Sequence, residues 1–177
     1  MNIKTEKITA KSPTIANETD WRGFYEELLP QVFHFFFYKT GDQIAAEELT
    51  AATFEKAWTS RFRYRKEMGA YRFYLFGIAR KVAADYFRKR HPESRLDENL
   101  PGPQQVEEQV DRRLNVQRLS AVITVLDRRE RELISLKYGA EMTNREIARL
   151  TGLSESNVGT VLHRAVLKLR QEWEKQE

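Results

Sequence analysis

The sequence predicts an all-α protein made of two small helical domains joined by an acidic, proline-containing linker, with a helix-turn-helix in the second domain. Apolar residues recur every three or four positions over long stretches, and not every second position as in strands. Two such stretches, 21–91 and 111–177, flank a segment in which prolines and acidic residues cluster. The domains are therefore predicted at 21–91 and 111–177, with a tail at 1–20 and a linker at 92–110.

The first domain is predicted to be helical almost throughout. Residues 1–20 are polar and show no apolar period, which is typical of a loose terminal tail. From residue 21 onward, apolar side chains fall at helical spacing, except in a basic and aromatic loop at 62–70. Pro30 begins a helix that ends near Gly41. Four helices are predicted in this domain, over 21–29, 30–41, 45–58 and 71–90.

The second domain begins with a predicted helix over 110–126. Asp127 and Glu130 then form a capping-box pattern, which starts a helix that ends at Gly139. Thr143 and Glu146 repeat this pattern at the start of a short helix. That pattern opens the segment that carries the helix-turn-helix.

A glycine turn and a further cap complete the helix-turn-helix. Gly152 lies where the short helix must stop and the chain must reverse, a position that often needs a positive φ. Ser154 offers an N-cap to the last helix. An ordinary corner between two helices also satisfies this pattern, but the spacing of Ala148, Gly152 and Val158 favours the DNA-binding version, in which the second helix is presented outward.

Charge is distributed unevenly along the chain. The net charge is +4, yet residues 91–111 hold six acids against one base, so the remainder carries +9. Before and within the long helix, cations alternate with aromatic rings, a mixture that suits single-stranded or melted nucleic acid. The alternative is that about half of these rings belong to the core and the cations are merely solvated.

Several classes of protein are excluded or disfavoured. The chain has no cysteine, its three histidines are dispersed, and it has neither a phosphate-binding glycine loop nor a paired metal-ligand motif. We therefore expect no enzyme activity, no cofactor and no metal. No apolar run approaches the roughly 20 residues of a membrane span and no signal-peptide core is present, so we expect no membrane insertion and a cytoplasmic location.

Three motifs in this order resemble a bacterial extracytoplasmic-function (ECF) sigma factor: FEKAW at 54–58, YLFGIARKVAADYFRKR at 74–90 and TNREIARLTGLSESNVGTVLHRAVLKLR at 143–170. The resemblance implies a subunit of RNA polymerase that selects promoters. It implies three partners, namely core RNA polymerase, promoter DNA and an anti-sigma factor. The first domain would bind the polymerase clamp and melt the proximal promoter element, and the second would read the distal element in the major groove.

The resemblance, together with residue chemistry, assigns three sets of candidate site residues. The polymerase-binding set is Glu47, Glu48, Leu49, Thr53 and Phe54. The set for the proximal element and melting is Arg63, Tyr64, Arg65, Lys66, Tyr71, Arg72, Arg80, Lys81 and Arg88, and the loop 65–70 matches the family segment that captures a flipped base. The set for the distal element is Ser156, Asn157, Thr160, His163, Arg164 and Lys168.

The chain departs from the family pattern at several positions. Ala51 and Ala52 replace a common Gln-Glu pair, and Lys81 stands where an Asn is frequent. Gly159, inside the recognition helix, costs on the order of 1 kcal/mol relative to Ala. It indicates either a close approach of the backbone to DNA or tolerance near the helix N-terminus.

The alternative function is a stand-alone helix-turn-helix regulator whose N-terminal domain senses a ligand or dimerises. It predicts tight operator binding by the chain alone. A sigma factor is instead expected to bind its promoter poorly without core polymerase, because the linker leaves the distance and orientation of the two domains unfixed.

Overall fold

The computed structural model describes residues 18–64, 70–89 and 118–175, and every regular element in these ranges is a helix. The elements of the first domain are α1 (Glu18–Thr40), α2 (Gln43–Thr59), a 3-10 turn η1 (Arg61–Arg63) and α3 (Tyr71–Lys89). Those of the second domain are helical residues 118–123, α5 (Arg128–Ile134), a π-helical turn η3 (Ser135–Gly139), α6 (Asn144–Thr151) and α7 (Glu155–Glu174). The all-α fold class is confirmed, whereas the predicted linker at 92–110 and most of the tail lie outside the described residues.

The first helix differs from its prediction. The two helices expected over 21–29 and 30–41 form one continuous helix, α1, which runs through Pro30 and begins at Glu18, inside the predicted tail. A proline within a helix removes one backbone hydrogen bond and costs about 3 kcal/mol. Here Pro30 is exposed, while Leu28 and Val32 on either side of it are buried in the same core. Burial of one apolar face along the whole helix therefore outweighs the local penalty.

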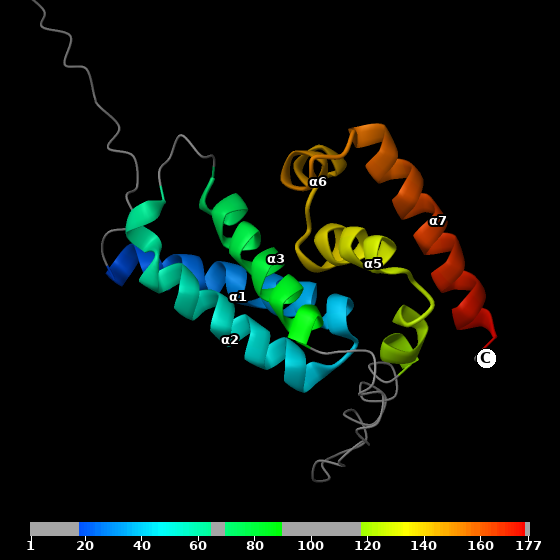
Figure 1. Cartoon of the computed structure of the whole chain (residues 1–177), viewed down its shortest axis with the longest axis horizontal. Coiled ribbons are helices and arrows are strands. Elements are labelled where there is room, and N and C mark those ends of the chain that lie inside the picture. Colours follow the sequence, from blue (N-terminus) through cyan, green and yellow to red (C-terminus); the bar gives the residue numbers. More distant parts are fainter. Residues whose placement is uncertain (1–17, 65–69, 90–117, 176–177) are drawn as a thin grey trace, which may run out of the picture.

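The three long helices of the first domain pack around an aromatic core. Helix α2 lies against both α1 and α3, as Figure 1 shows. Asp42 caps α2 by accepting a hydrogen bond from the Ala45 amide at 3.2 Å. Ala46 and Ala57 are fully buried on the inner face of α2, which lets the helix backbones approach closely. The aromatic side chains of α1 and α3 fill the remaining space.

The second domain follows its predicted caps closely. Both capping boxes form: Asp127 pairs with Glu130, and Thr143 pairs with Glu146. Each carboxylate accepts backbone hydrogen bonds, and these lower the pKa of Asp127 and of Glu146. Gly152 ends α6 with φ +76°, the left-handed conformation expected of it.

The last helix of the second domain begins at its predicted cap. The Ser154 side chain accepts a hydrogen bond from the Asn157 amide at 3.2 Å and so starts α7. The end of α6, the glycine turn and the start of α7 thus all have the predicted local geometry. The helix-turn-helix predicted over 143–165 is therefore present in the fold.

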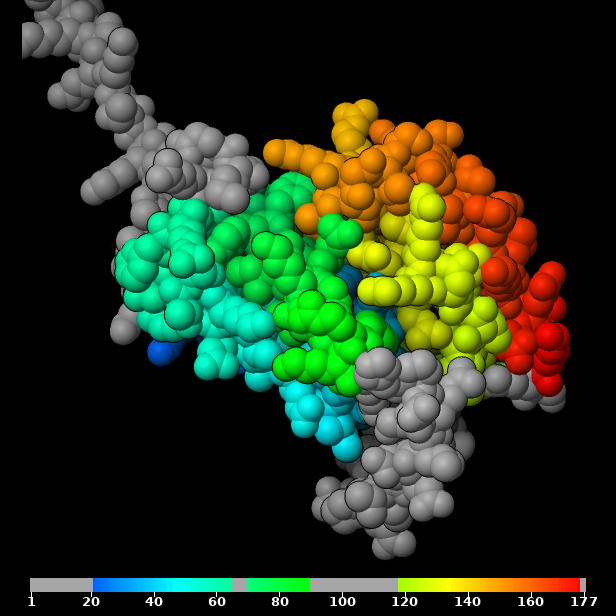
Figure 2. Space-filling model, in the orientation of Figure 1, coloured from blue at the N-terminus to red at the C-terminus, as the bar shows by residue number. Residues whose placement is uncertain are grey.

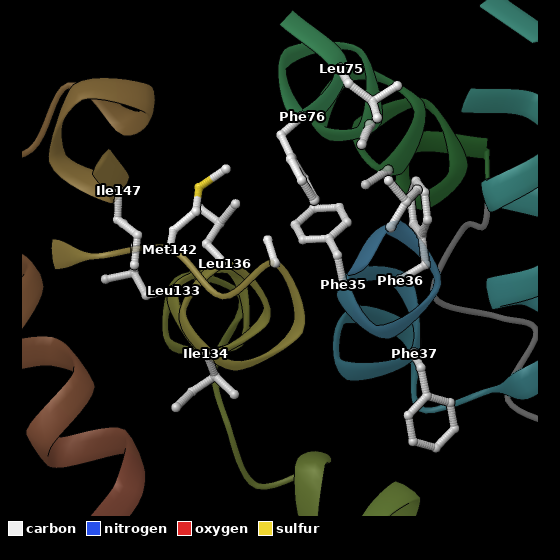
Figure 3. Close-up of a cluster of buried hydrophobic side chains, with 14 of the residues drawn as sticks. Phe35, Phe36, Phe37, Leu75, Phe76, Leu133, Ile134, Leu136, Met142 and Ile147 are labelled. Carbon is white, nitrogen blue, oxygen red and sulfur yellow. The ribbon is translucent and has the colours of Figure 1, made fainter. Parts of the chain in front are cut away.

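The two domains pack directly against each other, contrary to the expectation that the linker leaves them unfixed. The turn η3 lies on α1, and a Cβ added to Gly139 would come within 2.6 Å of the Phe35 backbone nitrogen. Phe35 and Phe76 of the first domain face Leu136 and Met142 of the second (Figure 3), and all four are buried in one continuous cluster. In Figure 2 the two domains form one unbroken surface on the face shown. The burial of apolar side chains between the two domains fixes their arrangement, and the composition of the linker could not predict this contact.

Candidate nucleic-acid interface

One face of α7 carries exposed polar side chains over nearly three turns. Val158, Val161, Leu162 and Ala165 are buried against α5 and α6, so the opposite side of the helix faces outward. Five of the six residues assigned to the distal element are exposed on that outward side, namely Ser156, Asn157, Thr160, His163 and Arg164. Amide, hydroxyl, imidazole and guanidinium groups on one helix match the donors and acceptors of base edges in the major groove.

Lys168, the sixth residue of that set, has a different role in the structure. Its ammonium nitrogen lies 2.7 and 2.9 Å from the two carboxylate oxygens of Glu130. Glu130 is the capping residue of α5 and its side chain is only 7% exposed, so this ion pair ties α7 to α5. The Lys168 side chain is nevertheless 47% exposed, so its assignment to the distal element stays a prediction.

Gly159 is half-buried in the second turn of α7. An added Cβ would meet only the Asn144 side-chain nitrogen, at 3.6 Å, an ordinary contact distance. Packing inside the protein therefore does not require a glycine at this position. The structure is compatible with both explanations offered by the sequence, a close approach of DNA and simple tolerance.

The cations of α3 divide into two groups. Lys81 and Arg88 are exposed, and Arg88 also lies 2.9 Å from Asp85 on the same helix. Arg80 was expected on the solvent side of α3 but faces the second domain, where its Nε is 2.7 Å from Glu132. Arg72 likewise donates a hydrogen bond to the Ala140 carbonyl. Both arginines thus reach across the domain boundary, Arg80 to Glu132 of α5 and Arg72 to Ala140 just after η3.

Two of the rings assigned to promoter melting belong to aromatic packing within the first domain. Tyr71 is 3% exposed, and its ring lies 5.0 Å from that of Phe24 and 5.3 Å from that of Tyr64. Burial raises the pKa of the Tyr71 hydroxyl. The assignment of Tyr71 to base stacking was therefore wrong, and Tyr64 is half-buried against it. Spacing alone could not separate these core rings from surface rings.

A different ring is exposed beside them. Phe62 is 71% exposed on the 3-10 turn η1, and the Arg61 guanidinium lies between its ring and that of Trp58, at 4.1 and 3.7 Å from the ring centroids. The Tyr74 hydroxyl donates to the Ser60 carbonyl at 2.9 Å and so holds the turn on α3. Arg63 is exposed next to it, whereas Arg65 and Lys66 lie outside the described residues. Phe62 and Tyr71 both belong to the stretch of alternating cations and aromatic rings that begins at residue 62. Only their exposure in the fold separates them, since Phe62 is on the surface and Tyr71 is in the core.

The polymerase-binding set also divides by burial. Glu47 and Glu48 are exposed on α2. Leu49 and Thr53 are buried in the core of the first domain, so their assignment as residues that contact the polymerase is corrected. Phe54 is 5% exposed, but its ring forms part of the wall of a groove between α1 and α2. The groove has a volume of about 390 Å³ and is lined by Tyr25, Leu29, Pro30, Phe33, His34, Glu47, Thr50, Ala51 and Phe54. An apolar groove with a carboxylate at its edge can hold an apolar side chain of a partner helix.

The domain boundary has unusual electrostatics at Glu132. Burial would raise the pKa of Glu132, but Lys39 at 3.8 Å and Arg80 at 2.7 Å outweigh it and the net shift is downward. Lys39 is only 6% exposed, and burial lowers its pKa to about 8 although Glu132 acts in the opposite direction. The Glu132 carboxylate thus forms ion pairs with two cations of the first domain, Lys39 and Arg80.

Within the described ranges, no three potential metal ligands lie close enough together to hold an ion. None of the described helices is long and apolar enough to cross a membrane. What the fold does present is a capped helix-turn-helix with an outward polar face, mounted on a basic helical domain. This arrangement defines a class, the helix-turn-helix DNA-binding proteins.

Comparison with known proteins identifies the family within that class. Residues 24–93 match sigma-70 region 2, and residues 117–169 match sigma-70 region 4. The ECF RNA polymerase sigma factor SigM of Bacillus subtilis is 27% identical over 149 residues, which cover 82% of this chain and 90% of SigM. The ECF sigma factor BldN of Streptomyces coelicolor is 28% identical over 164 residues, covering 87% of this chain and 61% of BldN.

A solved structure has the same fold. The sigma factor RpoE of Bartonella quintana, solved in complex with the anti-sigma factor NepR, superposes with a TM-score of 0.70 over 88% of this chain and 98% of RpoE, at 21% identity. The chain belongs to the sigma-70 family, in its ECF group. It is an RNA polymerase sigma factor, which directs promoter recognition and transcription initiation by sequence-specific DNA binding.

Proposed function

We propose that the two domains divide promoter recognition between them, with α7 reading the distal element and the first domain holding the melted proximal element. The observation that carries this proposal is the outward face of α7, where Asn157 and Arg164 are both exposed beside a buried apolar face. Asparagine pairs well with adenine and arginine with guanine in the major groove. Ser156, Thr160 and His163 extend the same face.

In the first domain, we propose that unpaired promoter bases and their phosphates lie along η1 and the exposed side of α3. Lys81, Arg88 and Arg63 supply exposed cations, and Phe62 supplies an exposed ring. Stacking on an aromatic ring contributes about 1–3 kcal/mol per base. Arg72 and Arg80 would join this surface only when their contacts with the second domain are released.

We propose further that the polymerase docks on the outer face of α2. Glu47 and Glu48 are exposed there, and Glu47 also lines the groove between α1 and α2. Ala51, which replaces the family's glutamine, leaves this groove open. The contact in this chain would therefore combine carboxylates with an apolar anchor.

The remaining functional assignments rest on the family. We propose that the protein works in the cytoplasm, where RNA polymerase transcribes, and that it has no enzymatic activity of its own. RpoE of Bartonella quintana was solved with an anti-sigma factor, and we propose that a protein of that kind also restrains this chain.

Reconstituted transcription tests the proposal. The purified chain is combined with core RNA polymerase, and promoter fragments are selected from a random library by run-off transcription. We expect a recurrent two-part promoter with the core enzyme, and weak, non-selective binding by the chain alone. Nanomolar, sequence-specific binding without the core enzyme would refute the proposal and favour a stand-alone regulator.

A further inference from the structure

A small cavity lies between α1, α3 and α5, and its walls carry more positive than negative charge. Three cations line it, Lys39 from α1, Arg80 from α3 and Arg128 from α5, against one carboxylate, that of Glu132. Its volume is about 40 Å³, which is room for about three water molecules. The cavity reaches solvent beside Arg128 and Ala84, which are both exposed. Its net charge of +2 makes it a candidate site for a small anion.

The buried lysine of this cavity is poorly compensated by the protein. Lys39 is 6% exposed, and its ammonium nitrogen lies 3.8 Å from Glu132 Oε2, which is too far for a hydrogen bond. Among the described residues, this carboxylate is the one ionic or hydrogen-bonding partner of the ammonium group. An ammonium group has three donors, and burying them without acceptors is costly. Burial lowers the pKa of Lys39 to about 8 although Glu132 acts in the opposite direction, so the carboxylate does not fully offset the burial.

The carboxylate of the cavity is already engaged by one of the three cations. Glu132 accepts a hydrogen bond from Arg80 Nε at 2.7 Å, a much closer contact than its pair with Lys39. The Arg128 guanidinium forms no hydrogen bond or ion pair with any residue in the part of the chain that the structure describes. The rings of Phe35 and Phe87 form apolar walls, which strengthen electrostatic interactions inside the cavity. Positive charge is therefore left over where few protein acceptors remain.

We propose that this cavity binds a phosphate group, which Lys39, Arg80 and Arg128 hold from three different helices. A phosphate oxygen would supply the acceptor that the Lys39 ammonium lacks, and the planar guanidinium of an arginine matches two oxygens of the same group. The cavity has room for one tetrahedral ion but not for a sugar or a base. The phosphate is either the free ion or the terminal group of a small metabolite whose remainder lies outside the mouth. The site is independent of promoter recognition, because its charge and volume are properties of the fold itself.

Binding is measured directly by equilibrium dialysis of the purified full chain against radiolabelled inorganic phosphate. We expect one saturable site per chain. Sulfate, which is also tetrahedral, should displace the label, whereas chloride at equal ionic strength should displace it far less. Uptake that does not saturate, or displacement by chloride as effective as that by sulfate, would show general attraction to a basic protein and would overturn the proposal.

Substitutions then locate the site. Lys39→Met removes the buried ammonium and keeps an unbranched apolar side chain, and Lys56→Met is its control, since Lys56 is exposed on α2 and does not line the cavity. We expect Lys39→Met to weaken phosphate binding roughly tenfold or more, the loss of one charge-assisted hydrogen bond, and Lys56→Met to leave it unchanged. Equal affinity in the parent chain and Lys39→Met would overturn the proposal.

A second pair of variants tests the mouth of the cavity. Arg128→Gln removes a cation that lines the cavity, whereas Arg129→Gln removes an equally charged, exposed neighbour that does not. Ala84→Leu adds volume at the mouth without changing any charge. We expect weaker phosphate binding in Arg128→Gln and Ala84→Leu, and parental binding in Arg129→Gln. Equal losses in the two arginine variants would assign the binding to surface charge and overturn the site.

Two further measurements complete the test. Adenosine diphosphate separates the two sources of phosphate: displacement of the label at lower concentration than unlabelled phosphate assigns the site to a metabolite, and displacement at higher concentration assigns it to the free ion. Thermal unfolding checks that binding occurs in the folded chain, since phosphate at about ten times its Kd should raise Tm by roughly 3–6 °C. Phosphate also stabilises proteins by exclusion from their surface, so the rise must be larger in the parent chain than in Lys39→Met. An equal rise in both would overturn the proposal.

Discussion

Gly159→Ala is the substitution whose outcome separates two explanations for a glycine inside the recognition helix. Alanine is favoured over glycine in a helix interior by about 0.8–1.0 kcal/mol. The structure adds no steric penalty, because the new Cβ meets only the Asn144 side chain at 3.6 Å. The substitution should therefore raise the free energy of unfolding by nearly the full propensity difference.

In a protein of this length, a gain of about 1 kcal/mol corresponds to a rise in Tm of roughly 2–4 °C. Circular dichroism at 222 nm during heating measures it. Gly152→Ala is the opposite control in the same motif, since φ +76° disfavours a Cβ and the variant should lose stability. A lower Tm for Gly159→Ala would show that the added Cβ clashes, or that the helix preference of alanine does not act at this position.

Promoter binding then decides between the explanations. If the DNA backbone approaches Gly159 closely, the stabilised variant should lose affinity for the distal element when bound to core polymerase. If the glycine is only tolerated, affinity should stay unchanged while stability rises. The two measurements together therefore assign the residue a role or show that it has none.

Three further predictions have defined outcomes. Lys39 has a pKa of about 8 in the fold against 10.5 when unfolded, so the unfolded chain binds more protons between about pH 8 and 10.5 and the free energy of unfolding rises with pH across that window. Lys39→Met should abolish this rise in pH-dependent denaturation and add roughly 1–3 kcal/mol to the free energy of unfolding at pH 7. A destabilised variant would instead show that the ion pair of Lys39 with Glu132 outweighs the cost of burying the lysine. Asn157→Ala or Arg164→Ala should cost roughly 1–3 kcal/mol at one base position in binding titrations of the polymerase complex on base-substituted promoters; a uniform loss across sequences would assign the residue to phosphate. Thr143→Ala removes the N-cap of α6 and should cost about 1 kcal/mol in chemical denaturation, and an unchanged midpoint would mean that the capping box contributes nothing.

Much of the second domain was predictable because its determinants are neighbours in the chain. A capping box needs two residues three positions apart, and both pairs, Asp127 with Glu130 and Thr143 with Glu146, form as predicted. Gly152 was placed by the same local logic, since a chain reversal after a short helix requires φ > 0. The exposed face of α7 followed from its apolar period.

The sites of the first domain were harder to predict, because burial and not residue type separates their members. Tyr71 and Phe62 both belong to the same alternating run of cations and rings, yet one is 3% exposed and the other 71%. Leu49 and Thr53 likewise match a polymerase-binding motif but point into the core. The helix break expected at Pro30 failed for a related reason, since packing along α1 outweighs the local preference.

The sequence was therefore informative where interactions between residues close in the chain determine the structure. These features are the all-helical class, the helix caps, the turns and the family motifs. The relation between the domains required the tertiary structure. Arg80 is 52 residues from Glu132 and 70 from Leu150, and Arg72 is 68 from Ala140. No spacing rule links such distant residues. They meet because Leu136, Met142 and the bare backbone of Gly139 fit against α1 and α3, and that apolar fit is what brings the arginines to acceptors in the other domain.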